Sequence, residues 1–192
     1  MIGISGLARS GKDTLANNFS EIISEEWGLN VKIFSFADEI KRQSDYFIKN
    51  NYKISAFSED TKEKEIIRDF LVCHGETMKK IHGNTIWADI IIEEIEKSNE
   101  KFFPIITDVR FDFEAKRVKE VNGQIVHIEK IGNKPPNSIE AKNDPLVQKV
   151  SDICHSWAAY EPDKMHLCED QAYILWQMLK ETHEEIWKKI YF

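Results

Sequence analysis

The first residues of the chain combine a glycine-bracketed loop with a lysine, an arrangement that suits the binding of phosphate groups. The spacing from Gly6 to Lys12 is G-x-x-x-x-G-K, with a short apolar strand before it and helical periodicity after it. Glycines let the backbone approach an anion closely, and successive N–H groups at the start of a helix point toward that anion. The pattern therefore predicts a nucleotide site with these ATP-binding residues: Gly6, Arg9, Ser10, Gly11, Lys12, Asp13 and Thr14.

The residue after the lysine departs from this pattern. A Ser or Thr hydroxyl usually binds Mg²⁺ there, but this chain has Asp13 followed by Thr14. Three interpretations stay open: Thr14 supplies the hydroxyl, Asp13 acts on the metal directly or through water, or Asp13 only complements the positive end of the helix.

A second candidate site follows the apolar strand expected at 102–108. Asp108 at the carboxyl end of that strand would hold Mg²⁺ or its water shell beside the phosphate loop, and Arg110 would reach a phosphate in the same crevice. The alternative is structural: Asp108 caps the helix that opens near Asp112, and Arg110 pairs with Glu114. We favour the functional interpretation, with Mg²⁺ bound by Asp108 and by Thr14 or Asp13.

Two further clusters could bind an acceptor. Positive charge follows the second strand, and a glycine at position 75 interrupts a charged helical segment, which predicts a break where side chains turn toward a ligand. Solvated surface charge is the alternative for Lys41 and Arg42, and a core position is the alternative for Trp87. With Arg110, the candidate acceptor-binding residues are Ser35, Asp38, Lys41, Arg42, Arg68, Glu76 and Trp87.

Hydrophobic periodicity predicts the elements that must position these residues. Strands are expected at 2–4, 31–36, 102–108, 124–129 and, more weakly, 165–168. Helices are expected at 12–27, 37–50, 63–82, 85–97, 113–121, 145–158 and 171–190, with irregular segments at 51–61 and 131–145. This alternation predicts an α/β fold of three layers, in which a parallel sheet of about five strands binds ligands at its carboxyl ends.

Composition narrows the class of protein. A chain of 192 residues suits a single domain, and its net charge of -7 argues against general binding to nucleic acid or membrane surfaces. It has no apolar run long enough to span a bilayer, and three dispersed cysteines favour a reducing cytoplasm. We expect small-molecule partners, and the last helix, with Trp176, Leu179 and Trp187, is either core or a homodimer face.

A zinc site is a competing interpretation of the sulfur and imidazole groups. Cys154-His155 could combine with His166 and Cys168, and Cys73-His74 could join them; four such groups could form a tetrahedral zinc site. The spacing matches no tight zinc knuckle, so we do not favour it.

Four segments together resemble a known family. Residues 10–14 (SGKDT), 34–41 (FSFADEIK), 68–87 and 107–115 (TDVRFDFEA) recur in this order in the deoxynucleoside monophosphate (dNMP) kinases of tailed bacteriophages, which have the P-loop nucleoside monophosphate kinase fold. Residues 163–170 are similar to that family's last strand and adenine loop. The resemblance implies transfer of the γ-phosphoryl group of ATP to a dNMP with Mg²⁺, in the host-cell cytoplasm.

The resemblance also implies a layout within one kinase domain. The core would comprise 1–36, 100–130 and 160–192, the acceptor-binding region 37–99, and a lid 131–150. Lid arginines normally stabilise the transferring phosphoryl group, but this segment offers only lysines. Either those lysines replace them, or other arginines do, or the range of acceptors is narrower; the residues in question are Lys134, Lys142, Lys149, Arg9, Arg42, Arg110 and Arg117.

The expected mechanism follows from these assignments. Lys12, Asp13, Asp108 and Arg110 would be catalytic, while arginines at 42, 68 and 110 position the acceptor phosphate. No strong base is needed because that phosphate is already anionic. Two alternatives remain: a P-loop kinase of another small acceptor, such as phosphomevalonate or dephospho-coenzyme A, and a nucleotide-binding module with weak catalysis.

Overall fold

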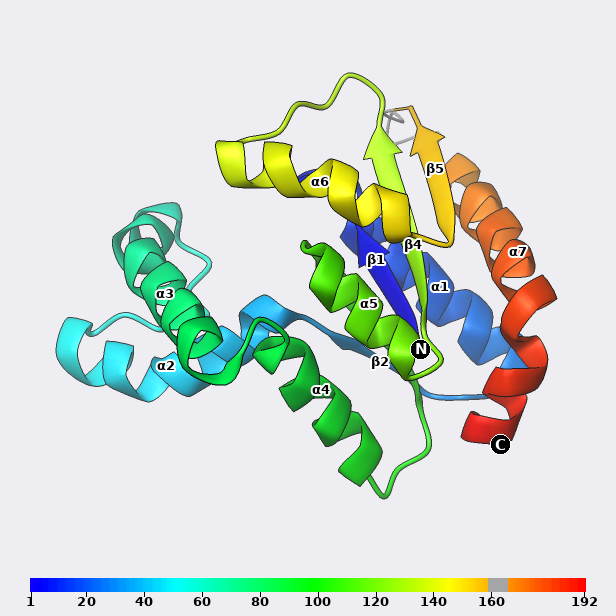
Figure 1. Ribbon diagram of the computed structural model, residues 1–192, viewed down its shortest axis with the longest axis horizontal. Helices are drawn as coiled ribbons and strands as arrows, with labels where there is room; N and C mark the ends of the chain where they lie inside the picture. Colours follow the sequence, from blue (N-terminus) through cyan, green and yellow to red (C-terminus); the bar gives the residue numbers. More distant parts are fainter. Residues whose placement is uncertain (159–165) are drawn as a thin grey trace.

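A computed structural model describes residues 1–158 and 166–192 of the chain. In this part, five parallel strands form one sheet with helices on both faces (Figure 1). The strands are β1 (Ile2–Ser5), β2 (Val31–Phe34), β3 (Phe103–Val109), β4 (Gln124–Lys130) and β5 (Ile153–Trp157), in the order β2-β3-β1-β4-β5. The predicted three-layer α/β fold is confirmed.

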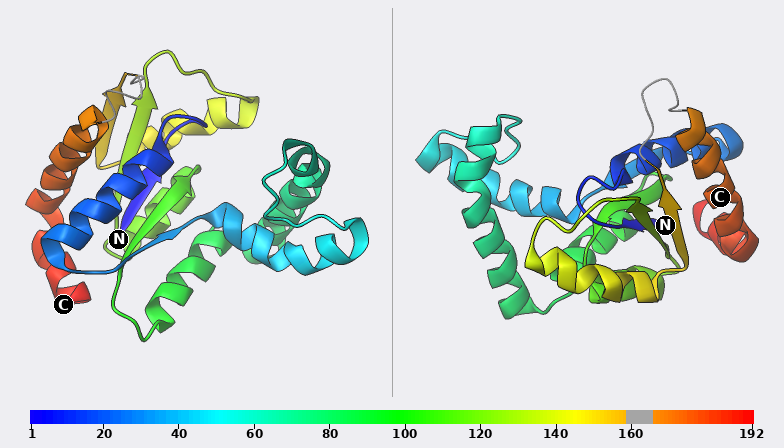
Figure 2. Two further views of the ribbon diagram at one scale, coloured as in Figure 1. Left: turned by 180° about the vertical axis from the view of Figure 1, so that it is seen from behind. Right: turned by 90° about the horizontal axis from the view of Figure 1, so that it is seen from above.

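The helices divide between the two faces and one projection. Helices α1 (Lys12–Trp27) and α7 (His166–Tyr191) cover one face, and α5 (Asp112–Glu120) and α6 (Ser138–Val150) cover the other (Figure 2). Helices α2 (Phe36–Tyr52) and α3 (Thr61–His82) project from the β2 side of the sheet, and α4 (Ile86–Lys97) packs against α2 and α5. Every predicted element up to residue 130 is confirmed to within two residues at each end.

The two faces of β3 explain why the sheet is covered on both sides. All of β3 is buried; Phe103 and Ile105 pack in the α1–α7 layer, while Ile106 and Val109 pack in the α4–α5 layer. A strand buried on both faces reads as a continuous apolar run, which is typical of parallel sheets with two helical layers.

The aromatic side chains of α7 belong to the first of these layers. Trp176 and Trp187 stack on each other at 5.8 Å between centroids, and Trp27 packs edge-on against Trp176 at 4.9 Å. Trp176, Leu179 and Trp187 are fully buried within the chain. Of the two interpretations of this helix, the structure therefore supports the core position for these three residues.

The elements predicted between residues 131 and 168 are largely wrong. Helix α6 begins at Ser138, because the side chain of Asn137 caps it by accepting a hydrogen bond from the Glu140 N–H at 2.9 Å. Residues 153–157 of the helix expected at 145–158 form the strand β5 instead. Its Cys, His and Ser residues lack a clear apolar pattern, and burial alternates along the strand.

The strand expected at 165–168 is also wrong where it is described. Residues 166–170, which the resemblance assigned to a last strand and an adenine loop, lie in α7. Cys168 faces the core from the first turn of that helix, so its burial does not reflect a strand. Residues 163–165 of this prediction lie outside the described part of the chain.

The helix break predicted at Gly75 is wrong as well, because α3 continues through it. Gly75 is buried where α3 crosses its neighbours: a Cβ atom there would lie 3.3 Å from Ile40 Cδ1 and 4.0 Å from Trp87 Nε1. Trp87 Nε1 also donates a hydrogen bond to the Gly75 carbonyl at 3.3 Å. The glycine therefore allows close helix packing and does not interrupt the helix.

No helix in the described ranges has the length and apolar character required to cross a membrane.

We predict that Gly75→Val lowers the free energy of unfolding by about 1–3 kcal/mol, because the added methyl groups overpack the contact with Ile40 and Trp87. Thr77→Val is the matched control, since it places the same side chain at an exposed position of the same helix. Urea unfolding of both variants measures the difference. Equal stability of the two variants would contradict this packing role.

Candidate active site

The loop between β1 and α1 needs glycine at two positions. Gly6 and Gly11 have φ angles of 135° and 95°. A Cβ atom at Gly6 would lie 2.2 Å from the Ile128 carbonyl oxygen, and one at Gly11 would lie 2.6 Å from Trp157 Cζ2. The indole of Trp157 also donates a hydrogen bond to the Ser10 carbonyl at 2.7 Å. The core thus fixes the conformation of the loop from two sides.

Lys12 places a largely buried cation at the mouth of this loop. Its Nζ atom donates hydrogen bonds to the carbonyl oxygens of Gly6 and Leu7, at 2.8 and 2.7 Å. Burial lowers the pKa of Lys12, and the nearby positive charge of Arg110 lowers it further. The carboxylates of Glu140, Asp13 and Asp108 act in the opposite direction and raise this pKa. The acidic residues predicted to organise Mg²⁺ therefore lie in the field of Lys12.

Asp108 joins the end of β3 to the start of α2. Its Oδ1 atom accepts a hydrogen bond from the Phe36 N–H at 2.8 Å, and Oδ2 accepts from the Ala37 N–H and the Ser35 hydroxyl, both at 2.9 Å. The structural alternative, a cap on the helix near Asp112, is wrong, because Asp108 caps α2. A carboxylate has about four acceptor positions, so three hydrogen bonds leave room for a metal-bound water.

Arg110 and Glu114 do not form the side-chain pair that was the alternative for Arg110. Glu114 Oε2 accepts hydrogen bonds from the backbone N–H groups of Arg110 and Phe111, at 2.9 and 3.1 Å. The guanidinium of Arg110 points instead toward α6, where its Nη1 atom lies 3.5 Å from Glu140 Oε1. Arg110 thus lies beside the first turn of α6, whose Glu140 also contacts the phosphate loop at Ala8.

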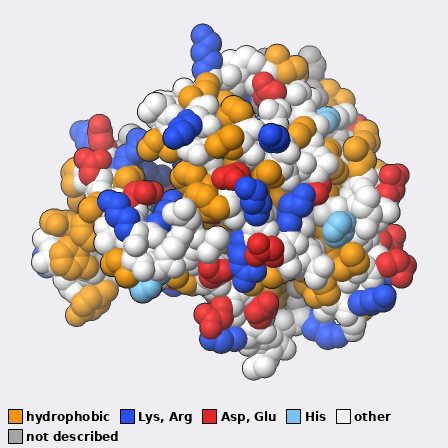
Figure 3. Space-filling model, viewed as in Figure 1, with side chains coloured by type: hydrophobic (Ala, Val, Ile, Leu, Met, Phe, Trp, Pro, Cys, Tyr) orange, Lys and Arg blue, Asp and Glu red, His pale blue; other side chains and the backbone are white. Residues whose placement is uncertain are grey.

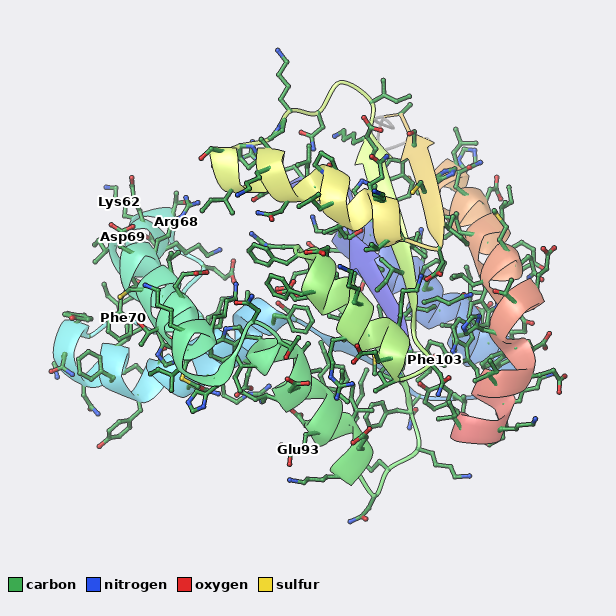
Figure 4. All side chains as sticks on the ribbon, viewed as in Figure 1. Lys62, Arg68, Asp69, Phe70, Glu93 and Phe103 are labelled. Atoms are coloured by element: carbon green, nitrogen blue, oxygen red, sulfur yellow. The ribbon has the colours of Figure 1, made fainter. Side chains whose placement is uncertain are left out.

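A cavity of about 300 Å³ opens beside Arg110, between α2, α3 and α6. Figure 3 shows the surface hollowed between the lobe formed by α2 and α3 and the rest of the molecule, and Figure 4 labels Arg68 on α3. The apolar residues that line the cavity include Phe36, Ile40, Leu71, Val72, Trp87 and Phe111. Its polar lining includes Lys41, Arg68, Glu76, Lys79, Asp108, Arg110, Glu114 and Glu140.

The structure brings together most, but not all, of the predicted acceptor residues. Five of them line this cavity: Lys41, Arg68, Glu76, Trp87 and Arg110. Ser35, Asp38 and Arg42 line a separate hollow beside Ile33 and Ile91. Arg42 forms ion pairs there with Glu39 and Glu94, at 2.6 and 3.2 Å.

Arg117, considered as a substitute for lid arginines, is engaged elsewhere. Its Nε atom lies 2.5 Å from Asp89 Oδ1 and its Nη1 atom 3.4 Å from Glu120 Oε2. Arg117 does not line the cavity. It joins α5 to α4, so its position does not suit contact with a transferring phosphoryl group.

Sequence reasoning missed the aromatic wall and one carboxylate. Phe111 stacks on Phe113 at 5.0 Å, and Lys79 lies 4.0 Å from the centre of the Phe111 ring. The only available signal for Phe111 was its place directly after Arg110. Nothing local in the sequence singles out Glu140, because its role depends on where the first turn of α6 lies.

Within the described ranges, no group of three or more His, Cys, Asp and Glu side chains is arranged to hold a metal ion. Cys73 and His74 lie on α3, whereas Cys154 and His155 lie on β5 at the opposite edge of the sheet. The candidate zinc ligands are therefore on separate elements.

Comparison with known proteins identifies one family. A family model described as phosphomevalonate kinase matches residues 4–124, which is more than half of the chain and extends from β1 to the start of β4. The match includes the phosphate loop, the α2–α4 region and the segment 108–114, and it ends before α6. A search of curated proteins gives no match.

The buried carboxyl of Glu114 provides a pH-dependent test of this site. Burial raises its pKa from 4.5 to about 7; the backbone N–H groups of Arg110 and Phe111 oppose the shift, the charge of Asp108 adds to it, and Lys79 opposes it. At pH values between 4.5 and about 7, Glu114 in the folded state holds a proton that it has lost in the unfolded state. The free energy of unfolding therefore falls as the pH rises through this window, by about 3 kcal/mol.

We predict that the stability difference between the wild-type chain and Glu114→Gln changes with pH in this way. Gln keeps an oxygen for both backbone N–H groups but does not titrate, so the variant gains relative stability as the pH rises from about 5 to about 8. Urea unfolding at several pH values across this range measures the stability difference. Glu185→Gln, at an exposed position, is the control. A difference that does not vary with pH would show that Glu114 is ionised throughout.

Proposed function

Because the chain belongs to the phosphomevalonate kinase family, it is an ATP-dependent phosphotransferase, and we propose that its acceptor is the phosphate of a deoxynucleoside monophosphate. The products would be ADP and a deoxynucleoside diphosphate. The proposal rests on one observation above the others: a cavity lined by both aromatic and cationic side chains opens beside Arg110, close to the phosphate loop.

The aromatic and the cationic residues that line this cavity suit the two ends of a nucleotide. Phe36, Trp87 and Phe111 supply flat apolar surface of the kind that a nucleobase packs against. Lys41, Arg68 and Arg110 supply positive charge, and a guanidinium can bind a phosphate through two parallel hydrogen bonds. We therefore assign residues 37–99 to acceptor binding and place the acceptor phosphate at Arg110.

The donor site lies on the other side of Arg110. The backbone of residues 6–14 and Lys12 would hold the phosphates of ATP, with Mg²⁺ bound by Asp108 through water and by Thr14 or Asp13. When bound, the metal neutralises charge on the β- and γ-phosphates. Lys12 and Arg110 would stabilise the charge that develops on the transferring group, and holding both substrates in line supplies much of the rate.

The family match supports a second candidate acceptor, phosphomevalonate, which is the substrate in the family's description. That molecule is a short aliphatic chain with an anionic group at each end. It has no flat surface to cover the aromatic side chains of Phe36, Trp87 and Phe111 that line the cavity. A nucleobase has such a surface, so we favour the nucleotide.

We predict that the chain releases ADP from ATP in the presence of at least one dNMP, and that Lys12→Ala lowers kcat by about 10²-fold or more. An assay coupled to ADP release measures both. Lys62→Ala is the control, because it removes a lysine exposed at the start of α3 and outside the cavity lining (Figure 4). Undiminished turnover of Lys12→Ala would contradict the proposed donor site.

The same assay separates the two acceptors. Phosphomevalonate is tested beside the four dNMPs, and each is also tested for its effect on the melting temperature, since selective stabilisation reports binding. If ADP is released with phosphomevalonate and with none of the dNMPs, phosphomevalonate replaces the dNMP as the proposed acceptor. Binding of ATP with no ADP release for any acceptor would favour a nucleotide-binding module.

A further inference from the structure

One carboxylate of α6 contacts both the phosphate loop and Arg110. Glu140 Oε2 accepts a hydrogen bond from the Ala8 N–H at 3.0 Å, and Oε1 lies 3.5 Å from Arg110 Nη1. The Glu140 side chain is only 14% exposed, although it lies in the first turn of a surface helix. Its negative charge also acts on Lys12.

The same side of α6 and the loop before it make further contacts with the core. The Asn133 amide donates a hydrogen bond to the Ala8 carbonyl at 2.9 Å, so both backbone groups of Ala8 are bound by this segment. One turn after Glu140, Asp144 Oδ2 lies 3.8 Å from Nε2 of the buried His127. The inward side of α6 is therefore acidic, the opposite of what the stabilisation of a phosphoryl group requires.

This arrangement gives Glu140 the electrostatic environment of a bound phosphate. Its carboxylate lies beside the cation of Arg110, its charge acts on Lys12, and it accepts a hydrogen bond from the Ala8 N–H of the phosphate loop. Two anions a few ångströms apart in a partly buried site repel each other strongly, because little water screens them. A phosphoryl group and the Glu140 carboxylate are thus unfavourable neighbours at this position.

We propose that Glu140 is an internal anion that competes with the transferred phosphoryl group, so that binding of ATP displaces it and releases Arg110 for the acceptor phosphate. This inference rests on the proposed function. It gives Glu140 a positioning role: it holds Arg110 toward α6 until the donor is bound. It also explains why the segment 131–150 carries no arginine, because its task at this position is to supply an anion.

The structure of α6 allows its first turns to move separately from its last. Pro145 lies inside the helix and has no N–H to donate to the preceding turn, which weakens the helix at that point. Beyond it, Val147 is buried in the core and the Ser151 hydroxyl bonds to the Val147 carbonyl at 2.9 Å. Glu140 lies on the other side of Pro145, so it can leave the loop while the end of α6 stays packed.

Competition of this kind makes donor and acceptor binding cooperative. If ATP frees Arg110, then ATP must strengthen dNMP binding, and dNMP must strengthen ATP binding by the same factor. Removing the charge of Glu140 removes the competitor, so both ligands bind more tightly alone and the cooperativity falls. A merely structural Glu140 would give none of these effects.

The test is calorimetric titration with a non-hydrolysable ATP analogue and with the dNMP found to be a substrate, each alone and in the presence of the other. Glu140→Gln keeps an oxygen for the Ala8 N–H but loses the charge. We expect it to bind the analogue about tenfold more tightly than the wild-type chain and to lose most of the cooperativity between ligands. Glu185→Gln, with the same charge change on the exposed side of α7, should match the wild type.

The outcomes are distinguishable. Unchanged or weaker binding of the analogue by Glu140→Gln, or undiminished cooperativity, overturns the inference while the proposed function stands. Failure of the wild-type chain to bind the analogue overturns both. Glu140→Ala serves as the second variant if Glu140→Gln folds poorly, with the same expected direction for analogue binding.

Discussion

The largely buried ammonium group of Lys12 is a positive charge that the surrounding carbonyl and carboxylate groups stabilise. Burial disfavours a cation, and here it lowers the pKa of Lys12 while hydrogen bonds to the Gly6 and Leu7 carbonyls hold the group in place. Carboxylates from α1, β3 and α6 compensate the charge. One positive charge thus has groups from three segments around it: the glycine-bracketed loop, the end of β3 and the first turn of α6.

Strand β3 connects the parts of the site. It lies between β1 and β2 in the sheet, so its carboxyl end reaches both the phosphate loop and the start of α2. Asp108 binds the first N–H groups of α2, and Arg110 extends to Glu140 on α6. Asp108 and Arg110, at and just after the end of β3, thus hold the start of α2 and meet the first turn of α6. This geometry joins the proposed donor and acceptor sites through one strand end.

The phosphate loop and the end of β3, where we propose the donor site, could be predicted from sequence because their signals are local. The spacing of Gly6, Gly11 and Lys12 and the apolar run before Asp108 needed no tertiary context, and the elements up to residue 130 follow the expected periodicity. The helix break predicted at Gly75 was wrong because the prediction used only the local preference of glycine and took no account of packing. The missing Cβ of Gly75 accommodates Ile40 and Trp87. Strand β5 has mixed polar residues at a sheet edge, so periodicity gave no strand signal.

The cavity of the proposed acceptor site depends on contacts between distant segments. Phe36, Leu71 and Phe111 come from three elements, and nothing in the sequence indicates that they share a wall. Arg42 was assigned to the acceptor from its charge, yet Glu39 and Glu94 hold it at another hollow. Glu140 required knowledge of where the first turn of α6 lies. Charge type can be read from sequence, but the partner of each charge cannot.

The most direct test of the account is a crystal structure of the chain with a bisubstrate analogue, in which adenosine and a deoxynucleoside are joined through a chain of phosphates. The account predicts phosphates bound by residues 6–14 and Lys12, the deoxynucleoside base against Phe36 and Phe111, Arg110 on the acceptor phosphate, and Glu140 beyond hydrogen-bonding distance of the Ala8 N–H. A base outside the cavity between α2, α3 and α6, or phosphates bound away from Lys12, would contradict it.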